Sequence, residues 1–147
     1  MIVKIQNLTK KFSIGGSFFT ALDNISLEIK NGEFLGLVGA SGSGKTTLLN
    51  IIGGLDSPTN GEISVLNQFM NTTSHTERAL IRRKNMGFIF QSYNLLPVYS
   101  VYENVELPLI LNNIDKKSRR KKVLEAIDAV GLSDKINSRP NQLSGGQ

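Results

Sequence analysis

The sequence predicts an α/β fold, and three features of the chain support this prediction. The apolar run Phe34–Val38 has the composition of a buried parallel strand, and a glycine-rich loop and an apolar helical segment over 46–52 follow it. Residues 2–8 and 25–29 carry apolar side chains at alternate positions, which is typical of strands with one buried face. From Leu95 onward the apolar spacing becomes helical. We therefore expect a mixed core followed by a helical part.

The loop between that strand and helix has the spacing of a phosphate-binding loop. Residues 39–46 fit the pattern G-x-x-x-x-G-K-[ST], which wraps nucleotide phosphates when it joins a strand to a helix. Its glycines allow a tight turn that points successive backbone N–H groups at an anion, and the helix N-terminus adds partial positive charge. The alternative is a glycine- and serine-rich turn that precedes a lysine by chance. The strand and helix on either side favour a P-loop NTPase core.

The side chains of this loop have separate predicted roles. Lys45 supplies a point charge for the β- and γ-phosphates. The Thr46 hydroxyl is placed to bind Mg²⁺, whose other sites are left to water and phosphate oxygens, and Thr47 is expected to meet the α-phosphate. This loop alone does not separate kinases, GTPases and transport ATPases. The predicted nucleotide-binding residues here are Gly39, Ala40, Ser41, Gly42, Ser43, Gly44, Lys45, Thr46 and Thr47.

The elements around the loop follow in chain order. Asn31 and Gly32 predict a turn, and residues 57–61 predict another that leads into a strand over 62–66. The early strands are expected to form a small antiparallel sheet beside the nucleotide core. Residues 82–84 are basic and are expected to close a short helix, where cations offset the helix dipole. A further strand is expected over 87–91.

A second helix is expected after Asp115, which is a candidate N-cap, and Gly131 is expected to end it. Its expected apolar face consists of Val123, Leu124, Ile127 and Val130. Residues 116–122 at its start are almost all basic, a position that is unfavourable for cations in the helix dipole. Such a run is usually a solvated face, and contact with anionic lipid headgroups is the alternative.

The last five residues narrow the nucleotide-binding class. Leu143–Gln147, preceded by Asn141 and Gln142, resembles the signature motif of ABC ATPases and follows the P-loop at the separation found in that family. Its serine hydroxyl and glycine N–H groups, at the expected start of a helix, form a second anion-binding device. The resemblance implies that the segment caps the γ-phosphate of ATP bound by another subunit in a head-to-tail dimer. The residues implied are Ser144, Gly145, Gly146 and Gln147.

The same resemblance implies roles for Gln91 and Lys45 in catalysis. Gln91 ends the expected strand over 87–91 and corresponds to the Q-loop glutamine, which contacts Mg²⁺ and the attacking water. It is therefore expected to bind the metal together with Thr46. The alternative for Gln91 is a glutamine at a strand end without such a role.

An aromatic residue near the N-terminus is expected to contact the adenine base. Phe12 falls where ABC ATPases carry a ring stacked on adenine, and phenylalanine provides the π-face that stacking needs. The competing interpretation is an apolar plug between two early strands. Phe18 or Phe19 could supply the ring instead.

The resemblance extends over essentially all 147 residues. Segments 92–97 and 103–108 are similar to the ATPase subunits of lipoprotein-release, macrolide-export and antimicrobial-peptide-resistance transporters. It implies an ATPase subunit with ATP and Mg²⁺ as cofactors, a membrane permease and a second ATP-binding subunit as partners, and a peripheral place on the cytoplasmic side of the cell membrane. The implied fold has a nucleotide-binding core with an antiparallel β subdomain over 1–94 and a helical subdomain over 95–147.

The family's Walker B strand, D-loop and switch histidine would lie after Gln147. His75 lies in a polar stretch and is expected to be a solvated loop residue. We therefore expect the N-terminal portion of a longer ATPase, with the C-terminal part of the core missing. These 147 residues alone are expected not to hydrolyse ATP, and their apolar strands are expected to expose an edge and an apolar face.

Composition agrees with a globular domain outside the membrane. No apolar run approaches the length of a membrane-spanning helix, and the first residues do not form a secretory signal. The chain has no cysteine, which suits a reducing compartment. The net charge of +5 is not accompanied by aromatic residues interleaved with the basic ones, so we do not expect nucleic acid as a partner.

Two other function classes stay open at this point. One is a nucleotide-gated regulatory or scaffold subunit of a membrane complex that moves no substrate. The other is an ABC ATPase of translation or DNA repair, which would be expected to carry large inserted domains or a tandem second cassette. The sequence shows neither a large inserted domain nor a tandem second cassette.

Overall fold

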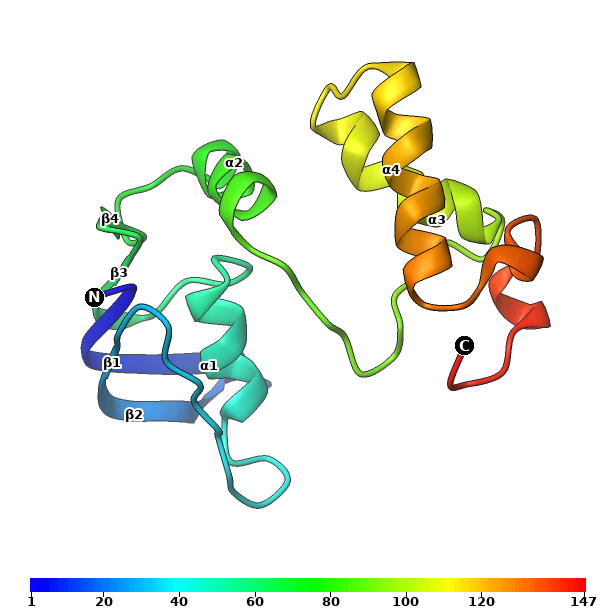
Figure 1. The fold of residues 1–147 in the computed structure, drawn as a ribbon. Coiled ribbons are helices and arrows are strands. Elements are labelled where there is room, and N and C mark those ends of the chain that lie inside the picture. Colours follow the sequence, from blue (N-terminus) through cyan, green and yellow to red (C-terminus); the bar gives the residue numbers. More distant parts are fainter. The chain divides into compact units, whose positions relative to one another are not determined.

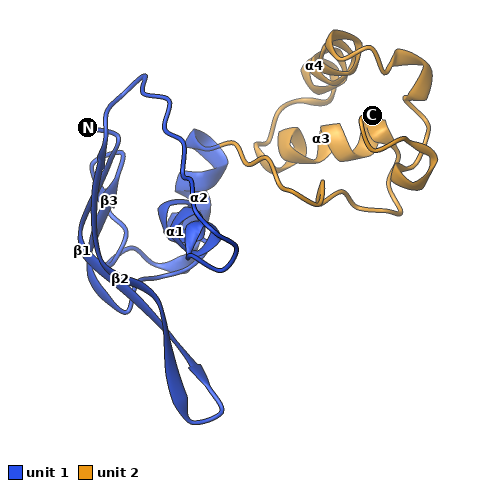
Figure 2. Cartoon of the chain, turned by 90° about the horizontal axis from the view of Figure 1, so that it is seen from below, with its two compact units in different colours: residues 1–86 blue, residues 87–147 orange.

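A computed structural model describes residues 1–147, and the chain divides into two compact units, Met1–Met86 and Gly87–Gln147 (Figures 1 and 2). The first unit contains the sheet and helices α1 and α2, and the second contains helices α3 and α4. The compact units meet at a different residue from the expected domain boundary at 94. The boundary at 94 stays a prediction, because it divides the chain by the subdomains of the family fold, whereas the two compact units are divided by where the chain packs against itself.

The first unit is built on a four-stranded antiparallel sheet with the order β2-β1-β3-β4. Strands β1 (Val3–Ile14) and β2 (Ser17–Ile29) form a long hairpin, and β3 (Asn60–Val65) pairs with the other edge of β1. The short β4 (Gln68–Phe69) completes the sheet. Ile5 lies opposite both Leu27 and Ile63, so apolar side chains meet across three strands. The expected antiparallel sheet is confirmed.

Helices α1 (Lys45–Ile52) and α2 (His75–Asn85) lie on one face of this sheet (Figure 2). Leu48 and Ile51 of α1 and Ile81 of α2 are buried in one cluster with the inward side chains of β1 and β3. Ser74 and Glu77 form a capping box at the start of α2. His75 is therefore the first residue of a helix, and the expectation of a loop residue there is wrong, although the side chain is exposed as expected.

The second unit contains α3 (Val101–Leu111) and α4 (Lys116–Ala129), which pack against each other. Val101, Val123 and Ile127 form its buried centre. Asp115 caps α4 and Gly131 follows its end with a φ of +68°, as predicted. Two expectations are wrong here. The helix expected from Leu95 onward begins only at Val101, because Ser100 and Glu103 form a capping box there. Leu124 and Val130, which were expected on the apolar face of α4, are exposed because no second element covers them. Two short 3₁₀ turns, Ser133–Lys135 and Pro140–Gln142, lead toward the C-terminus.

The two expected apolar strands, 34–38 and 87–91, do not form strands. Phe34 and Val38 are almost fully exposed, and Ile89 is completely so. A buried parallel strand needs a hydrogen-bonded neighbour and a covering layer, and neither segment pairs with another strand within residues 1–147. The expected exposure of their apolar side chains is confirmed, and the strand assignment is not.

No helix of the chain has the length and apolar character that crossing a membrane requires.

Candidate phosphate-binding loop and neighbouring contacts

The glycine-rich loop is held by the sheet on one side and by α1 on the other. Gly44 directly precedes α1, and its backbone carbonyl accepts a hydrogen bond from the Leu48 N–H at 2.9 Å. Leu48 and Ile51 bury the inward face of the helix in the core. The loop is therefore attached to the packed core of the first unit through α1. The segment over 34–38 that precedes it is not paired with any strand.

Gly44 has to be glycine for two independent reasons. Its φ of +88° lies in the left-handed region that side chains with a Cβ avoid. A Cβ at this position would also lie 2.4 Å from the Ala21 carbonyl oxygen and 2.8 Å from Leu22 Cδ2. The loop thus passes directly over β2, and this close approach fixes where α1 begins. Gly42 shares the positive φ, at +78°, but faces open space.

Lys45 folds back over the loop that precedes it. Its Nζ donates to the carbonyl oxygens of Gly39 at 2.8 Å and Ala40 at 2.6 Å, and to Ser43 Oγ at 3.2 Å. No carboxylate of the chain pairs with this ammonium group. Its positive charge is therefore positioned by neutral acceptors and stays available to an anion.

The N-terminus of α1 differs from the other helix starts of the chain. Ser74, Ser100 and Asp115 cap α2, α3 and α4 with side-chain oxygens. Helix α1 has no side-chain cap and no acidic residue in its first turn. The first backbone N–H groups of α1 therefore donate to no capping side chain, and they can donate to a phosphate instead. Thr46 is exposed and Thr47 half-buried in this same turn.

These features fit ATP with Mg²⁺. The glycines leave a cradle without side chains, the free N–H groups and Lys45 provide donors and positive charge, and Thr46 provides an exposed hydroxyl. No group of three or more His, Cys, Asp and Glu side chains in residues 1–147 could hold a metal ion by itself. A divalent cation here would depend on a hydroxyl and on the phosphate oxygens.

Phe12 lies in β1, directly opposite Phe19 in the hairpin. It is 37% exposed, whereas Phe19 is 52% and Phe18 76% exposed. Lys10 Nζ lies 4.8 Å from the centroid of the Phe12 ring, at the distance of a cation–π contact. The ring is thus held more firmly than its two neighbours in the hairpin, which favours Phe12 as a fixed stacking surface.

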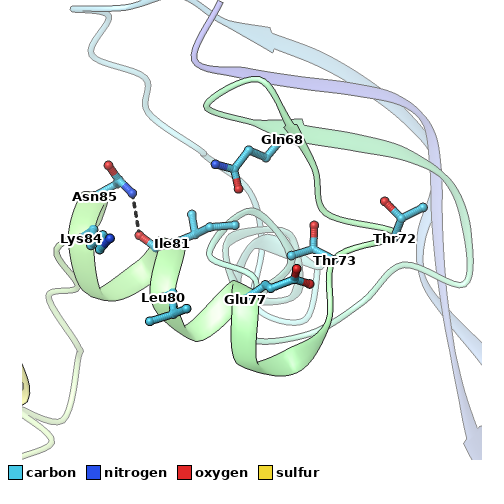
Figure 3. A pocket seen from close by; sticks show the side chains of 8 residues that line it. All are labelled: Gln68, Thr72, Thr73, Glu77, Leu80, Ile81, Lys84 and Asn85. Carbon is cyan, nitrogen blue, oxygen red and sulfur yellow. Dashed lines mark hydrogen bonds between the residues drawn. The ribbon is translucent and has the colours of Figure 1, made fainter.

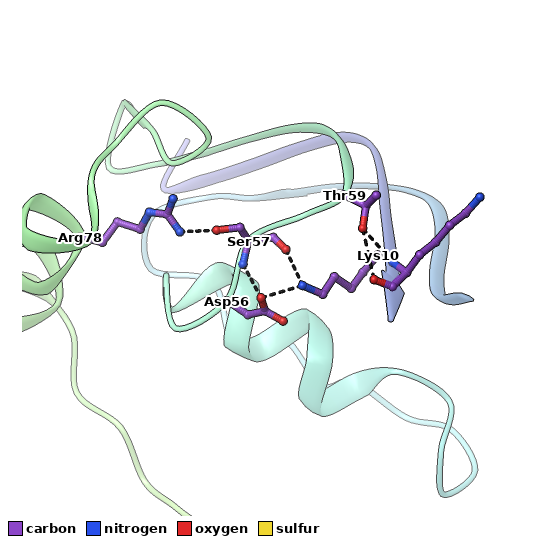
Figure 4. A network of polar contacts seen from close by, with 6 residues as sticks. Lys10, Asp56, Ser57, Thr59 and Arg78 are labelled. Carbon is purple, nitrogen blue, oxygen red and sulfur yellow. Dashed lines mark hydrogen bonds and ion pairs between the residues drawn. The ribbon is translucent and has the colours of Figure 1, made fainter. Parts of the chain in front are cut away.

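Lys10 is itself fixed by residues that follow α1 (Figure 4). Its Nζ donates to Asp56 Oδ1 at 2.7 Å and to the Ser57 carbonyl oxygen at 2.8 Å. The Ser57 hydroxyl accepts a hydrogen bond from the buried Arg78 of α2. Partial burial alone would raise the pKa of Asp56, but the Lys10 hydrogen bond, the Ser57 N–H and the charges of Lys10 and Arg78 outweigh it and lower the pKa. The Asp56 carboxylate therefore stays ionised at neutral pH.

This network was not predicted from the sequence. Lys10 and Asp56 are separated by 46 positions, and neither belongs to a recognisable motif. The one signal available was a lysine two positions before the predicted adenine ring, which places both side chains on the same face of a strand.

Gln91 and the 143–147 segment lie in the second unit, whereas the P-loop lies in the first. Gln91 is exposed and begins a turn. Residues 144–147 also form a turn, in which the Gln147 N–H donates to the Ser144 carbonyl at 3.0 Å and Gln147 Oε1 accepts from the Ser144 N–H at 2.9 Å. The hydrogen bond from the Ser144 N–H to Gln147 Oε1 is of the kind that a capping box makes at a helix N-terminus, and the expected helix start stays a prediction. Their predicted ligand roles stay predictions.

A pocket of the first unit lies away from the P-loop, between α2 and the segment after β4 (Figure 3). It has a volume of about 410 Å³. Two of its polar side chains already have hydrogen-bond partners: Thr73 Oγ1 donates to the Phe69 carbonyl, and Glu77 caps α2. Its lining residues are Gln68, Thr72, Thr73, Glu77, Leu80, Ile81, Lys84 and Asn85. None of the predicted nucleotide contacts lines it.

Comparison with known proteins agrees with the loop geometry. Residues 22–147 match the family model described as ABC transporter. The chain is 45% identical over 150 aligned positions to MJ0796, an uncharacterised ABC transporter ATP-binding protein of Methanocaldococcus jannaschii; the alignment covers 99% of this chain and 64% of that protein. It is 42% identical to the macrolide export ATP-binding/permease protein MacB of Brucella abortus, over 99% of this chain and 23% of MacB.

Solved structures give the same result for the fold. A dimeric structure of the ATP-binding cassette MJ0796 in a post-hydrolysis state, bound to ADP and Pi, matches with a TM-score of 0.91 at 46% identity. The match covers 99% of this chain and 64% of that one. The chain thus spans 64% of the length of MJ0796 and 23% of that of MacB, and its fold is that of the cassette with a P-loop NTPase core.

Proposed function

The chain belongs to the ABC transporter family, and from this premise we propose that it is an ATP-binding subunit that couples ATP binding and hydrolysis to conformational change in a membrane permease. One observation carries the ATP-binding part: the uncompensated Lys45 ammonium group lies over a loop that leads into a helix without a cap. That arrangement concentrates donors and positive charge where a triphosphate would lie.

Each residue of the loop then has a distinct task. The N–H groups of the glycine-rich segment over 39–44 surround the phosphates, and Lys45 leaves its carbonyl partners to contact the β- and γ-phosphates. Thr46 would hold Mg²⁺, which would neutralise phosphate charge, and Thr47 would contact the α-phosphate. By its correspondence to the Q-loop glutamine, Gln91 would contact Mg²⁺ and orient the attacking water. Lys45 and Gln91 are the catalytic residues that this portion of the chain contributes.

We propose that the 144–147 segment acts on the nucleotide of a second subunit. The N–H groups of Gly145 and Gly146 and the Ser144 hydroxyl suit a phosphate, because the two hydrogen bonds between Ser144 and Gln147 do not use them. The dimeric structures of the related cassette support a second ATP-binding subunit as partner. We also propose a membrane permease as partner and a peripheral place on the cytoplasmic side of the membrane, and the family membership supports both.

We propose that residues 1–147 lack the groups that would complete hydrolysis. No carboxylate pairs with Lys45, and no group of three or more His, Cys, Asp and Glu side chains could hold a metal ion, whereas phosphoryl transfer needs a polarised water and a complete metal shell. The relatives extend well beyond the matched region, and we propose that the corresponding part of this protein supplies these groups. Residues 1–147 alone are then expected to bind nucleotide weakly and not to turn it over.

Replacing Phe12 with alanine is expected to weaken ATP binding by about 1–2 kcal/mol, the range for an aromatic ring stacked on a nucleobase. Binding of inorganic triphosphate should hardly change, because that ligand has no base. Calorimetric titration of the full-length protein with both ligands measures this difference.

Phe18→Ala is the matched control, because Phe18 lies in the same hairpin and is 76% exposed. It should leave both affinities unchanged. If Phe12→Ala lowers the two affinities equally, the ring supports the hairpin and does not hold the base. If Phe18→Ala alone shows the ATP-specific loss, Phe18 is the stacking residue.

A further inference from the structure

The loop that joins α3 to α4, together with the helix turns beside it, forms a surface that ATP binding does not use. We call residues 110–122 the hairpin tip; its connecting loop is yellow in Figure 1. Six of the seven residues over 116–122 are basic. They are Lys116, Lys117, Arg119, Arg120, Lys121 and Lys122.

Two of these six cations have a partner within the fold. Arg119 binds Glu106 of α3 at 2.7 Å and the Ile114 carbonyl at 2.9 Å, so it ties the two helices together. Lys121 lies 3.8 Å from Glu125 in an exposed pair. The remaining four are exposed and have no ion-pair partner: Lys116, Lys117, Arg120 and Lys122.

The nearby carboxylates do not neutralise this charge. Glu106 and Glu125 are engaged as described, and Asp115 accepts hydrogen bonds from the backbone N–H groups of residues 117 and 118. Cations in the first turn of a helix oppose its dipole, so Lys116 and Lys117 are unfavourably placed in the isolated helix and would be favoured by an external anion.

Exposed aliphatic side chains lie at the same tip. Ile110 is 44% and Leu111 55% exposed at the end of α3. The loop after them is ordered by hydrogen bonds from the Asn113 N–H to the Ile110 carbonyl and from the Ile114 N–H to the Leu109 carbonyl. Aliphatic and basic side chains thus share one exposed end of a rigid hairpin, which is the composition of surfaces that lie at the membrane interface.

We propose that the hairpin tip binds the surface of an anionic lipid bilayer. The four unpaired cations contact lipid phosphates and other anionic headgroups, and Ile110 and Leu111 enter the boundary between headgroups and acyl chains. A nucleic acid is a poorer match, because the tip has no aromatic residue on which a base could stack. The inference goes beyond the proposed function, since it requires neither ATP nor the permease.

Sedimentation of the full-length protein with vesicles tests this proposal. One vesicle preparation is phosphatidylcholine alone, and the other also contains phosphatidylglycerol as its only anionic lipid. The test variant is Lys116→Gln with Lys117→Gln and Lys122→Gln. The matched control is Lys11→Gln with Lys30→Gln and Lys84→Gln, which removes the same charge from exposed lysines outside the tip. Thermal unfolding followed by circular dichroism verifies that both variants are folded.

The wild-type protein should bind the anionic vesicles and not those of phosphatidylcholine alone. The tip variant should lose about a hundredfold in partition coefficient, from roughly fivefold for each lysine near an anionic surface, and the control variant should lose little. Ile110→Ser with Leu111→Ser should lower partitioning about tenfold in the same vesicles, from the apolar area removed. Raising the salt to about 1 M should weaken binding, because screening shortens to about 3 Å.

Several results would overturn the proposal. Equal losses in the tip and control variants would show that net charge and not the tip is responsible. Equal binding to both vesicle types, or no binding to either, would remove the anionic lipid as partner. If a polyglutamate peptide binds in a way that depends on the tip lysines while vesicles do not bind, the partner is an acidic protein segment.

Discussion

Replacing Lys45 with alanine in the full-length protein is expected to lower the affinity for Mg-ATP by about 10- to 150-fold, which corresponds to about 1.5–3 kcal/mol for a charge-assisted contact. The ammonium group is oriented by two carbonyls and by no carboxylate. Its contact with phosphate therefore replaces hydrogen bonds to neutral carbonyl oxygens by one to an anion. Titration with a fluorescent ATP analogue measures the loss.

Lys30→Ala is a suitable control, because Lys30 is an exposed lysine with no ion-pair partner at the end of β2. It should bind Mg-ATP as the wild-type protein does. If the two variants and the wild-type protein have equal affinities, the loop over 39–46 is not the phosphate site. Because Lys45 also holds Gly39 and Ala40, thermal unfolding of the variant separates a damaged loop from a lost contact.

Gly44→Ala is expected to destabilise the protein by about 2–5 kcal/mol. About 1–2 kcal/mol comes from a side chain in the left-handed region, and about 1–3 kcal/mol comes from the contact of its Cβ with the Ala21 carbonyl and Leu22. The strain lies where the loop passes over β2, so the start of α1 has to shift. Urea unfolding of the full-length protein measures the change in the free energy of unfolding.

Two other glycines provide graded controls. Gly42→Ala has the positive φ without the contact and should cost about 1–2 kcal/mol. Gly36→Ala has neither feature and should be close to neutral. If Gly44→Ala costs no more than Gly42→Ala, the close approach to β2 does not exist in the folded protein.

Elements with local signals were predicted correctly from the sequence. Alternating side chains gave the strands over 2–8 and 25–29, and α1 and α4 follow from loop and cap residues such as Gly44 and Asp115. The strands expected over 34–38 and 87–91 are wrong because an apolar run has no means of specifying its neighbours. Strand formation there depends on pairing with other segments, which the local sequence does not contain.

The candidate site divides in the same way. The phosphate loop could be predicted because its glycines, lysine and threonine occupy consecutive positions, and the matching family supports it. The contact of Lys10 with Asp56 could not, because it joins two segments that only the folded sheet brings together. The helix start expected at 143–147 stays a prediction, and the hydrogen bond from the Ser144 N–H to Gln147 Oε1 agrees with it.

The most direct test of the central claim is steady-state phosphate release from Mg-ATP. Three proteins are compared: the full-length chain, its Lys45→Ala variant, and residues 1–147. The full-length chain should turn over, the Lys45→Ala variant should be nearly inactive, and residues 1–147 should release no phosphate above the Lys45→Ala background. Turnover that does not depend on Lys45, or Lys45-dependent turnover above about 1 s⁻¹ by residues 1–147 alone, would contradict the account.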